Sequence, residues 1–467
     1  MIGIVSAGGY IPYYKLTGEV LSSQWSGTTK GQRSVANHDE DAITMAIEAT
    51  FNALDFRDPK AIDGLYFCST SMPYKEKSNS AFIATVLDMR NDVFTADISG
   101  SLRAGTSALR AGRDAVASGF ASSIIVTTAD IRLAVPGDST ERMLGDGGAA
   151  VIIGKDNVIA EIVDIYSTTH EYLDVWRLDE DKYIQSADAK FTLDTGYSRF
   201  MTESALAIMK RNGVNVQDIS AVAAYSPEGR MLRSIASSMK IPPEKFVNVV
   251  DSVGDSGTAN GMLALVWALE KAKPGEIILF LTHSSGADAV LLRTTEHIAN
   301  WKSKKTIEEQ IKRMRTLTSY GKYLQFREIL PREDIRVWTA APVLWREEKE
   351  NYRLIAKRCN KCEAVQYPVR RVCWNCKTKD DMSDIKLNRT GKVFTFTKDH
   401  LPPNPDPPTV MVSADLEGGG RFYTQMTDCD PSKVEIGMEV ELTLRKIHKG
   451  GGFNNYFWKF RPKVYSD

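Results

Sequence analysis

The chain has 467 residues, enough for about two to four domains of ordinary size. Its 59 Lys and Arg residues balance 59 Asp and Glu residues, which argues against a general nucleic-acid-binding protein, because such proteins carry a basic excess. No apolar run approaches the roughly 18–20 residues that span a bilayer, and the opening MIGIVS lacks the basic segment of a signal peptide. We therefore expect a multidomain cytoplasmic protein without a membrane span.

The first 293 residues alternate short apolar strands with amphipathic helices, which is the pattern of an α/β protein. A helix is predicted over residues 41–54, because its apolar residues recur with helical spacing. Strands are predicted at residues 2–6, 64–68, 124–128 and 149–153.

This pattern returns about 150 residues further along the chain. A strand at residues 93–97, followed by Gly100 and a helix of small residues, matches a strand at 247–251 that is followed by Gly254 and a similar helix. The strand near residue 124 has a counterpart that begins at Ile277. The sequence therefore predicts an internal duplication.

Four of the six cysteines form two C-x2-C pairs separated by ten residues, namely Cys359, Cys362, Cys373 and Cys376. Four clustered thiolates suit tetrahedral zinc, and a disulfide framework is not expected in a chain of this size without a secretion signal. Because four thiolates leave no open position for water, we expect one structural zinc ion per chain. Cys68 and Cys429 lie elsewhere and are expected to be buried, unreactive thiols.

The C-terminal third has a different composition. A mixed-charge helix is predicted over residues 301–315. Beyond the cysteines, five short strands separated by turn residues predict a small OB-like barrel, at residues 392–398, 409–416, 421–427, 439–447 and 456–461. The alternating aromatics of the last strand are interpreted as core residues and not as a stacking platform for nucleic acid.

These elements divide the chain into five predicted parts. They are two α/β halves at residues 1–155 and 156–293, a helical linker at 294–350, a zinc ribbon at 351–385 and an OB-fold barrel at 386–467.

The first 293 residues resemble the thiolase superfamily, most closely its archaeal 3-hydroxy-3-methylglutaryl-CoA (HMG-CoA) synthase branch. The resemblance rests on GIVSAGGYIPYYKL, DEDAITMAIEA, STSMPY, PGDSTERMLGDGGAAVIIG and AKPGEIILFLTHSSGADAVLL. The C-terminal part resembles a zinc-ribbon/OB-fold family of acyl-CoA-associated proteins, through RCNKCEAVQYPVRRVCWNC and GKVFTFT. Together they imply a duplicated thiolase-type layered α/β/α/β/α fold, followed by a zinc ribbon and a small OB-like β-barrel.

Aligned on these motifs, the polar catalytic positions of the relatives have all changed. The nucleophilic Cys that precedes Ala-Gly-Thr is replaced by Leu102, which cannot form an acyl-enzyme. The Glu before S-x-P-Y is replaced by Thr70, the His of H-Q-P-N by Tyr225, and the Asn of G-N-T by Asp255.

The resemblance therefore favours an acyl-CoA-binding protein whose reaction needs no covalent intermediate. We expect a lyase that cleaves a C–C bond of a β-hydroxyacyl-CoA by retro-aldol chemistry, with Tyr225 as base or acid and Asp255 as its proton relay. His283 lies in a loop that approaches the thioester in relatives. The amides of Ser285 and Gly286 are the expected oxyanion donors, and Thr70 and Leu102 are expected to line the substrate site.

Two other functions stay open. The first is an HMG-CoA synthase-like or thiolase-like condensing acyltransferase, which would need Ser101 or Cys68 as its nucleophile. The second is a non-catalytic acyl-CoA-binding scaffold of a thiolase complex, in which Tyr225 fills the space of the lost imidazole and Asp255 caps a helix. The resemblance also implies a homodimer, with a separate thiolase as a further candidate partner; no nucleic-acid or membrane partner is expected.

Overall fold

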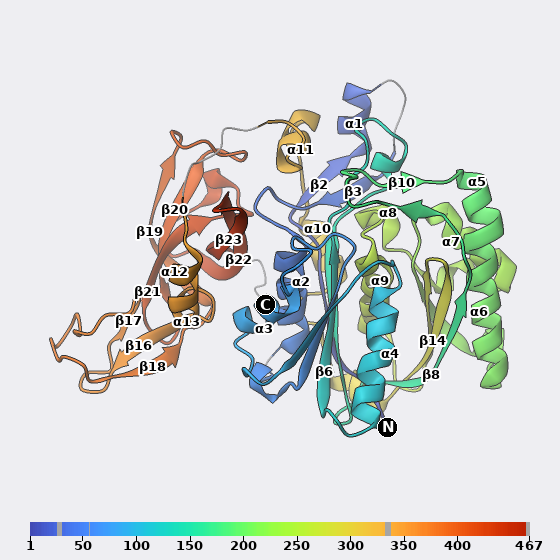
Figure 1. Cartoon of the computed structure of the whole chain (residues 1–467), viewed down its shortest axis with the longest axis horizontal. Helices are drawn as coiled ribbons and strands as arrows, with labels where there is room; N and C mark the ends of the chain where they lie inside the picture. Colours follow the sequence, from blue (N-terminus) through green and yellow to red (C-terminus); the bar gives the residue numbers. More distant parts are fainter. Residues whose placement is uncertain (26–29, 56, 332–337, 464–467) are drawn as a thin grey trace. The chain divides into compact units, whose positions relative to one another are not determined.

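The computed structural model describes residues 1–25, 30–55, 57–331 and 338–463. They form two compact units (Figure 1). Unit 1 comprises Met1–Ala36 and Asp41–Tyr323, and unit 2 comprises Asn37–Glu40 and Leu324–Asp467. None of the helices in the described ranges combines the length and the apolar composition needed to cross a membrane.

Unit 1 is built on a ten-stranded sheet with the strand order β12-β11-β13-β14-β8-β1-β7-β6-β4-β5. Its strands are β1 (Gly3–Tyr10), β4 (Gly64–Cys68), β5 (Phe94–Ile98), β6 (Ser123–Asp130), β7 (Gly147–Gly154), β8 (Ala160–Thr169), β11 (Ile219–Ala224), β12 (Phe246–Val247), β13 (Ile277–His283) and β14 (Gly286–Thr294). The order β5-β4-β6-β7-β1 is repeated as β12-β11-β13-β14-β8, which confirms the predicted duplication. In each half, three neighbouring strands are parallel and the next two pairings are antiparallel.

The helices of unit 1 fall into two kinds. Almost all residues of α2 (Ala42–Leu54) and α9 (Thr258–Lys271) are buried, so these two helices are enclosed on nearly every side. In contrast, α4 (Ala104–Ala117), α6 (Ser198–Arg211) and α7 (Gly229–Met239) bury one face only. This combination of buried and covering helices is the layered arrangement expected of a thiolase-type fold.

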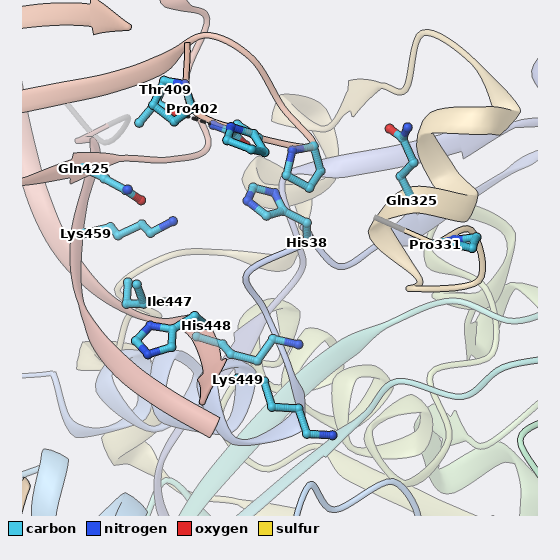
Figure 2. A pocket seen from close by; sticks show the side chains of 14 residues that line it. His38, Gln325, Pro331, Pro402, Thr409, Gln425, Ile447, His448, Lys449 and Lys459 are labelled. Carbon is cyan, nitrogen blue, oxygen red and sulfur yellow. Dashed lines mark hydrogen bonds between the residues drawn. The ribbon is translucent and has the colours of Figure 1, made fainter. Parts of the chain in front are cut away.

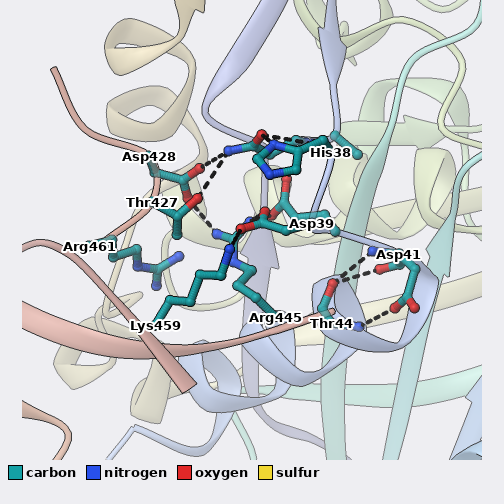
Figure 3. Close-up of polar contacts among 12 residues, drawn as sticks. His38, Asp39, Asp41, Thr44, Thr427, Asp428, Arg445, Lys459 and Arg461 are labelled. Atoms are coloured by element: carbon teal, nitrogen blue, oxygen red, sulfur yellow. Dashed lines mark hydrogen bonds and ion pairs between the residues drawn. The ribbon is translucent and has the colours of Figure 1, made fainter. Parts of the chain in front are cut away.

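The N-terminus of α2 is fixed by a reciprocal pair of hydrogen bonds. The Asp41 side chain accepts from the backbone N–H of Thr44 at 3.0 Å, and the Thr44 hydroxyl accepts from the N–H of Asp41 at 2.9 Å (Figure 3). Such a capping box satisfies two backbone donors that would otherwise have no partner, so α2 begins at the position that the sequence predicts.

Two predicted elements are shorter or different in the structure. The strand at 247–251 ends at Val247, because Asn248 and Asp251 bond to each other and start the short helix α8 (Val250–Val253). The helix predicted over 301–315 is only α10 (Ile307–Arg313), since Thr306 caps its N-terminus. Residues 294–323 of the predicted linker belong to unit 1, where β15 (Arg315–Thr316) pairs with β2 (Tyr14–Thr17).

Unit 2 contains a three-stranded ribbon and a closed barrel. The ribbon consists of β16 (Ile355–Cys359), β17 (Val365–Gln366) and β18 (Met382–Lys386). The barrel consists of β19 (Thr390–Asp399), β20 (Thr409–Leu416), β21 (Arg421–Met426), β22 (Glu439–Gly450) and β23 (Phe453–Pro462). All five predicted barrel strands are confirmed. Tyr456, Trp458 and Phe460 are buried, as expected for core residues.

A short segment from the N-terminal part of the sequence, Asn37–Glu40, also belongs to unit 2. Arg445, on β22, has only 1% of its surface exposed and pairs with three carboxylates (Figure 3). These are Asp39 at 3.2 Å, Glu40 at 2.8 Å and Asp428. Buried charges are tolerated only when they are paired, so this cluster ties the segment to the barrel.

Asp39 has a second cationic partner, because the Lys459 ammonium lies 2.9 Å from its other oxygen. Burial by itself would raise the pKa of Asp39. The charges of Lys459 and Arg445 outweigh this effect and hold the pKa well below its usual value. Asp39 is therefore ionised at neutral pH.

Candidate active site and zinc site

Four of the predicted site residues, two from each half, lie at or beyond the carboxyl ends of parallel strands. Thr70 follows β4, Leu102 follows β5, Tyr225 follows β11, and His283 is the last residue of β13. Ligands of open α/β sheets bind beyond these strand ends. Residues that are far apart in sequence therefore lie at equivalent strand ends in the two halves of the duplicated fold.

Tyr225 and Asp255 meet in a buried polar cluster. The Tyr225 hydroxyl donates to Asp255 Oδ2 at 3.1 Å, and Arg132 Nη2 lies 2.6 Å from the same oxygen. Asp255 Oδ1 accepts from the N–H of Gly257 at 3.0 Å. Burial, followed by the Asp255 carboxylate, raises the pKa of Tyr225 well above its usual value of 10.0. Tyr225 is therefore a neutral phenol at physiological pH, so it does not act as a preformed phenolate base.

Arg132 is a member of this cluster that the sequence did not indicate. Its Nη2 also donates to the Asp255 carbonyl oxygen at 3.2 Å, and the residue is only 4% exposed. The guanidinium Nε is buried without a hydrogen-bond partner among the described residues. The internal repeat could have pointed to Arg132 in the sequence. Arg132 follows β6, and β6 is the counterpart of β13, the strand that ends at His283.

Asp130 is a second residue that sequence reasoning missed. Its Oδ1 accepts hydrogen bonds from the Thr70 backbone N–H at 2.8 Å and from the hydroxyls of Ser69 and Ser71. Its Oδ2 accepts from the N–H of Thr258, at the start of α9, at 2.8 Å. Asp130 therefore fixes the Thr70 loop of the first half against a helix of the second half.

His283 is buried beside an acidic residue. Its Nδ1 lies 3.4 Å from Asp174 Oδ2, and its Nε2 has no hydrogen-bond partner among the described residues. Burial, together with the nearby Arg103 charge, lowers the pKa of His283 to about 3, so the imidazole is neutral. Burial also raises the pKa of Asp174. No role was predicted for Asp174 from the sequence, and its pairing with His283 is decided by the fold.

The bend after β13 contains the two predicted oxyanion donors. Ser285 has a φ of 45° and Gly286 a φ of 115°, so the backbone turns through the left-handed region. A Cβ atom on Gly286 would lie 2.2 Å from the Thr168 carbonyl oxygen, which explains the glycine. The role of the two amides as oxyanion donors stays a prediction.

Leu102, Ser101 and the two cysteines outside the ribbon make packing or hydrogen-bonding contacts, or are buried. The half-buried Leu102 packs against the apolar cluster of the second half. The hydroxyl of Ser101 accepts from the N–H of Arg103 at 3.1 Å, as a helix-start residue does. Cys68 and Cys429 are buried, and burial raises the pKa of the Cys68 thiol far above its usual value. Cys68 is thus a poor nucleophile.

The ribbon brings its four cysteines together. The sulfur atoms of Cys359, Cys362, Cys373 and Cys376 all lie within 4.8 Å of one another. Two of the pairs, Cys359–Cys376 and Cys362–Cys373, are 3.5 and 3.6 Å apart. Tetrahedral zinc with bonds of about 2.3 Å needs sulfurs roughly 3.8 Å apart. The donor set therefore fits one structural zinc ion.

Replacing both Cys359 and Cys362 with serine is expected to reduce bound zinc from about one ion per chain to nearly none. The ribbon is then expected to unfold, because zinc binding supplies much of the folding free energy of such small modules. Metal analysis and hydrogen exchange of residues 355–386 measure the two effects. Cys429→Ser is the matched control and should keep its zinc. A double variant that retains zinc would show that the ligands are wrongly assigned.

Family models match three parts of the chain. Residues 209–294 match the C-terminal domain of 3-oxoacyl-[acyl-carrier-protein] synthase III. Residues 346–381 match the rubredoxin-like zinc ribbon domain of ChsH2, and residues 384–445 match its C-terminal OB-fold domain. The predicted zinc ribbon and OB-like barrel are thereby confirmed as types of domain.

Two similar relatives are the hydroxymethylglutaryl-CoA synthases of Methanopyrus kandleri and Methanocaldococcus jannaschii. The first is 31% identical over 343 residues, which cover 70% of this chain and 98% of the relative. The second is 30% identical over 342 residues, which cover 70% and 99%.

Solved structures show the same fold. An HMG-CoA synthase complexed with CoA matches 73% of this chain and 95% of its own length, with a TM-score of 0.64 and 17% identity. The 3-oxoacyl-[acyl-carrier-protein] synthase III of Aquifex aeolicus matches 63% of this chain and all of its own, with a TM-score of 0.57 and 22% identity.

Proposed function

The chain belongs to the HMG-CoA synthase family of the thiolase superfamily, and from this premise we propose that unit 1 is an acyl-CoA lyase. It cleaves the Cα–Cβ bond of a β-hydroxyacyl-CoA by a retro-aldol reaction. The observation that carries this proposal is the buried Tyr225–Asp255–Arg132 cluster, in a chain that has Leu102 at the nucleophile position. The family site has thus lost the group for acyl transfer, while these polar groups offer a proton-transfer pair.

The proposed reaction breaks the Cα–Cβ bond and, in net, transfers one proton from the β-hydroxyl oxygen to Cα. The β-hydroxyl proton passes to the Tyr225 oxygen as the phenol proton passes to Asp255, 3.1 Å away, so Tyr225 stays neutral. The Cα–Cβ electron pair then forms the thioester enolate, and a carbonyl compound is released. Return of the proton to Cα gives a shorter acyl-CoA. No acyl-enzyme forms and no CoA is released.

Arg132 positions the proton acceptor of this relay and favours the return step. Its guanidinium lies 2.6 Å from Asp255 Oδ2, the oxygen that is proposed to receive the phenol proton. Once Asp255 is protonated, the buried Arg132 charge has lost its counterion, which is costly at 4% exposure. This cost favours return of the proton to the enolate.

Three buried polar atoms have no partner among the described residues and are proposed to contact the substrate. They are Thr70 Oγ1, Arg132 Nε and His283 Nε2. Buried polar atoms are nearly always hydrogen-bonded, so a bound ligand is a reasonable source of the missing partners. We assign the thioester oxygen to the backbone amides of Ser285 and Gly286, with the neutral His283 beside it. The homodimer and the thiolase partner stay predictions from resemblance.

HMG-CoA synthase-like condensation is the second candidate, favoured by the match to 98% of the length of a synthase relative. Condensation that proceeds through an acyl-enzyme would need a nucleophile other than residue 102, because leucine cannot form one. Neither available group is well suited, because Ser101 accepts a helix-start hydrogen bond and burial raises the pKa of Cys68.

The full chain should convert members of a panel of β-hydroxyacyl-CoAs into a shorter acyl-CoA and a carbonyl compound, with no free CoA. Mass spectrometry of the products and of the intact protein measures this directly, and the protein should carry no acyl adduct. Ser101→Ala should behave like the wild type. Free CoA from two acyl-CoAs, with an adduct, would favour condensation, whereas binding without turnover would favour the scaffold.

A further inference from the structure

Unit 2 contains a cavity of about 410 Å³ at one end of the barrel (Figure 2). We propose that this cavity is a nucleotide-binding site, which holds a phosphate group against lysine and histidine side chains and a planar base against a wall of prolines. The cavity is built by unit 2 alone, so the proposal does not rest on the function proposed for unit 1.

The position of the cavity in the barrel is the first argument. It is lined by the loop between β19 and β20, by the end of β22 and by β23. In OB folds, the loops after the first and fourth strands, with the adjoining face, are the usual ligand-binding region. The β19–β20 loop and the β22–β23 hairpin occupy those two places here.

The charge of the lining is the second argument. The described lining of the cavity contains no Asp or Glu. It contains five basic side chains, those of His38, Lys446, His448, Lys449 and Lys459. Two of the lysines are held in place by carboxylates, Lys459 by Asp39 at 2.9 Å and Lys446 by Glu328 at 3.1 Å. Lys449 has no ion pair among the described residues. It therefore offers an uncompensated charge to an anionic ligand.

The opposite wall is apolar and stiff. Pro402, Pro403 and Pro405 have a fixed φ and no backbone N–H, so they present ring faces and no donors. The loop is held to the barrel by Asn404 Nδ2, which donates to Thr409 Oγ1 at 2.9 Å. Such a preformed surface can cover a flat apolar group at little cost in conformational entropy.

A polar group for the edge of a base is also present. Gln425, on β21, lines the cavity, and its amide makes no hydrogen bond among the described residues. Figure 2 shows it beside Lys459, in agreement with the pairing of their neighbours Met426 and Phe460. An amide both donates and accepts, which suits the edge of a heterocyclic base. The volume falls in the usual range of small-molecule sites, about 300–1,000 Å³.

A free nucleotide and the nucleotide part of CoA share this chemistry. Calorimetry of the full chain with adenosine 3′,5′-bisphosphate, AMP, CoA and inorganic phosphate separates them. We expect the bisphosphate to bind, and Lys449→Glu to weaken its binding by about tenfold or more, because an attraction becomes a repulsion. Lys433→Glu, an exposed lysine of unit 2 outside the cavity lining, is the matched control and should leave affinity unchanged.

Hydrogen exchange locates the binding independently of affinity. The bisphosphate should protect residues 400–409 and 446–450. Binding of AMP as well as the bisphosphate would identify a free-nucleotide site, and binding of only the bisphosphate and CoA would identify a site for the CoA nucleotide. The proposal is overturned if no probe binds, if Lys449→Glu binds like the wild type, if protection lies elsewhere, or if inorganic phosphate binds as tightly as the nucleotides. None of these readouts requires turnover, so failure of the lyase proposal is a separate result.

Discussion

Replacing Tyr225 with phenylalanine is expected to lower the rate of β-hydroxyacyl-CoA cleavage by about 10²–10⁴-fold, the usual contribution of a positioned acid–base group. The variant keeps the ring in its apolar surroundings and removes only the hydroxyl that bonds to Asp255. Acyl-CoA binding should therefore change little. Initial rates and calorimetric binding of the substrate measure the two quantities separately.

Tyr197→Phe is the matched control for this experiment. The Tyr197 hydroxyl is also buried, but it donates to the Tyr225 carbonyl oxygen at 2.7 Å and does not reach the Asp255 side chain through any described hydrogen bond. This variant should lose some stability and keep most of its rate. The wild-type rate should show no loss from ionisation of Tyr225 between about pH 7 and 9, because the pKa of that phenol lies well above 10.0. A fully active Tyr225→Phe enzyme would leave Tyr225 with a structural role only.

Arg445→Met is expected to destabilise unit 2 by about 3–5 kcal/mol, which is typical when one member of a buried ion cluster is removed. Methionine fills much of the space, but Asp39, Glu40 and Asp428 lose a shared cation at about 1–2% side-chain exposure. Urea unfolding followed by hydrogen exchange of the barrel strands measures the loss for unit 2 separately from unit 1.

Two further variants test whether burial of the charges causes the loss of stability expected for Arg445→Met. Arg421→Met removes an exposed pair with Asp415 on the same barrel and should shift the unfolding midpoint far less. Adding Asp428→Asn to Arg445→Met should recover part of the lost stability, because one buried negative charge is removed. Equal losses for the Arg445 and Arg421 variants would argue against the buried cluster as the stabilising feature.

The same cluster predicts that the stability of unit 2 decreases as the pH falls. The folded-state pKa of Asp39 lies below its ordinary value of 3.8, so its ion pairs stabilise unit 2 fully above about pH 5. This contribution is lost as the pH falls through the unfolded-state and then the folded-state pKa. Acid unfolding of the barrel should therefore begin at a higher pH in an Arg445→Met variant, where the pKa of Asp39 loses one of its depressing charges.

The sequence by itself determined the features that depend on local pattern. Short stretches separated by Gly, Pro and Asp turns predicted the barrel strands, because such turn residues interrupt a strand. The spacing of Cys359, Cys362, Cys373 and Cys376 predicted the zinc site, because two short turns present their thiolates to one ion. Repeated strand–glycine–helix patterns predicted the two halves of unit 1, and motif alignment placed Leu102 at the position of the relatives' nucleophile.

Only the tertiary structure decided which buried charges are paired. Arg132 meets Asp255 across 123 residues, and Arg445 meets Asp39 across 406 residues. No local periodicity encodes such partners, because a buried charge is stabilised by whichever opposite charge the fold brings within a few ångströms. The same reason explains why Asp39 and Glu40, in a motif that resembles the thiolase half of the chain, are instead part of the barrel unit.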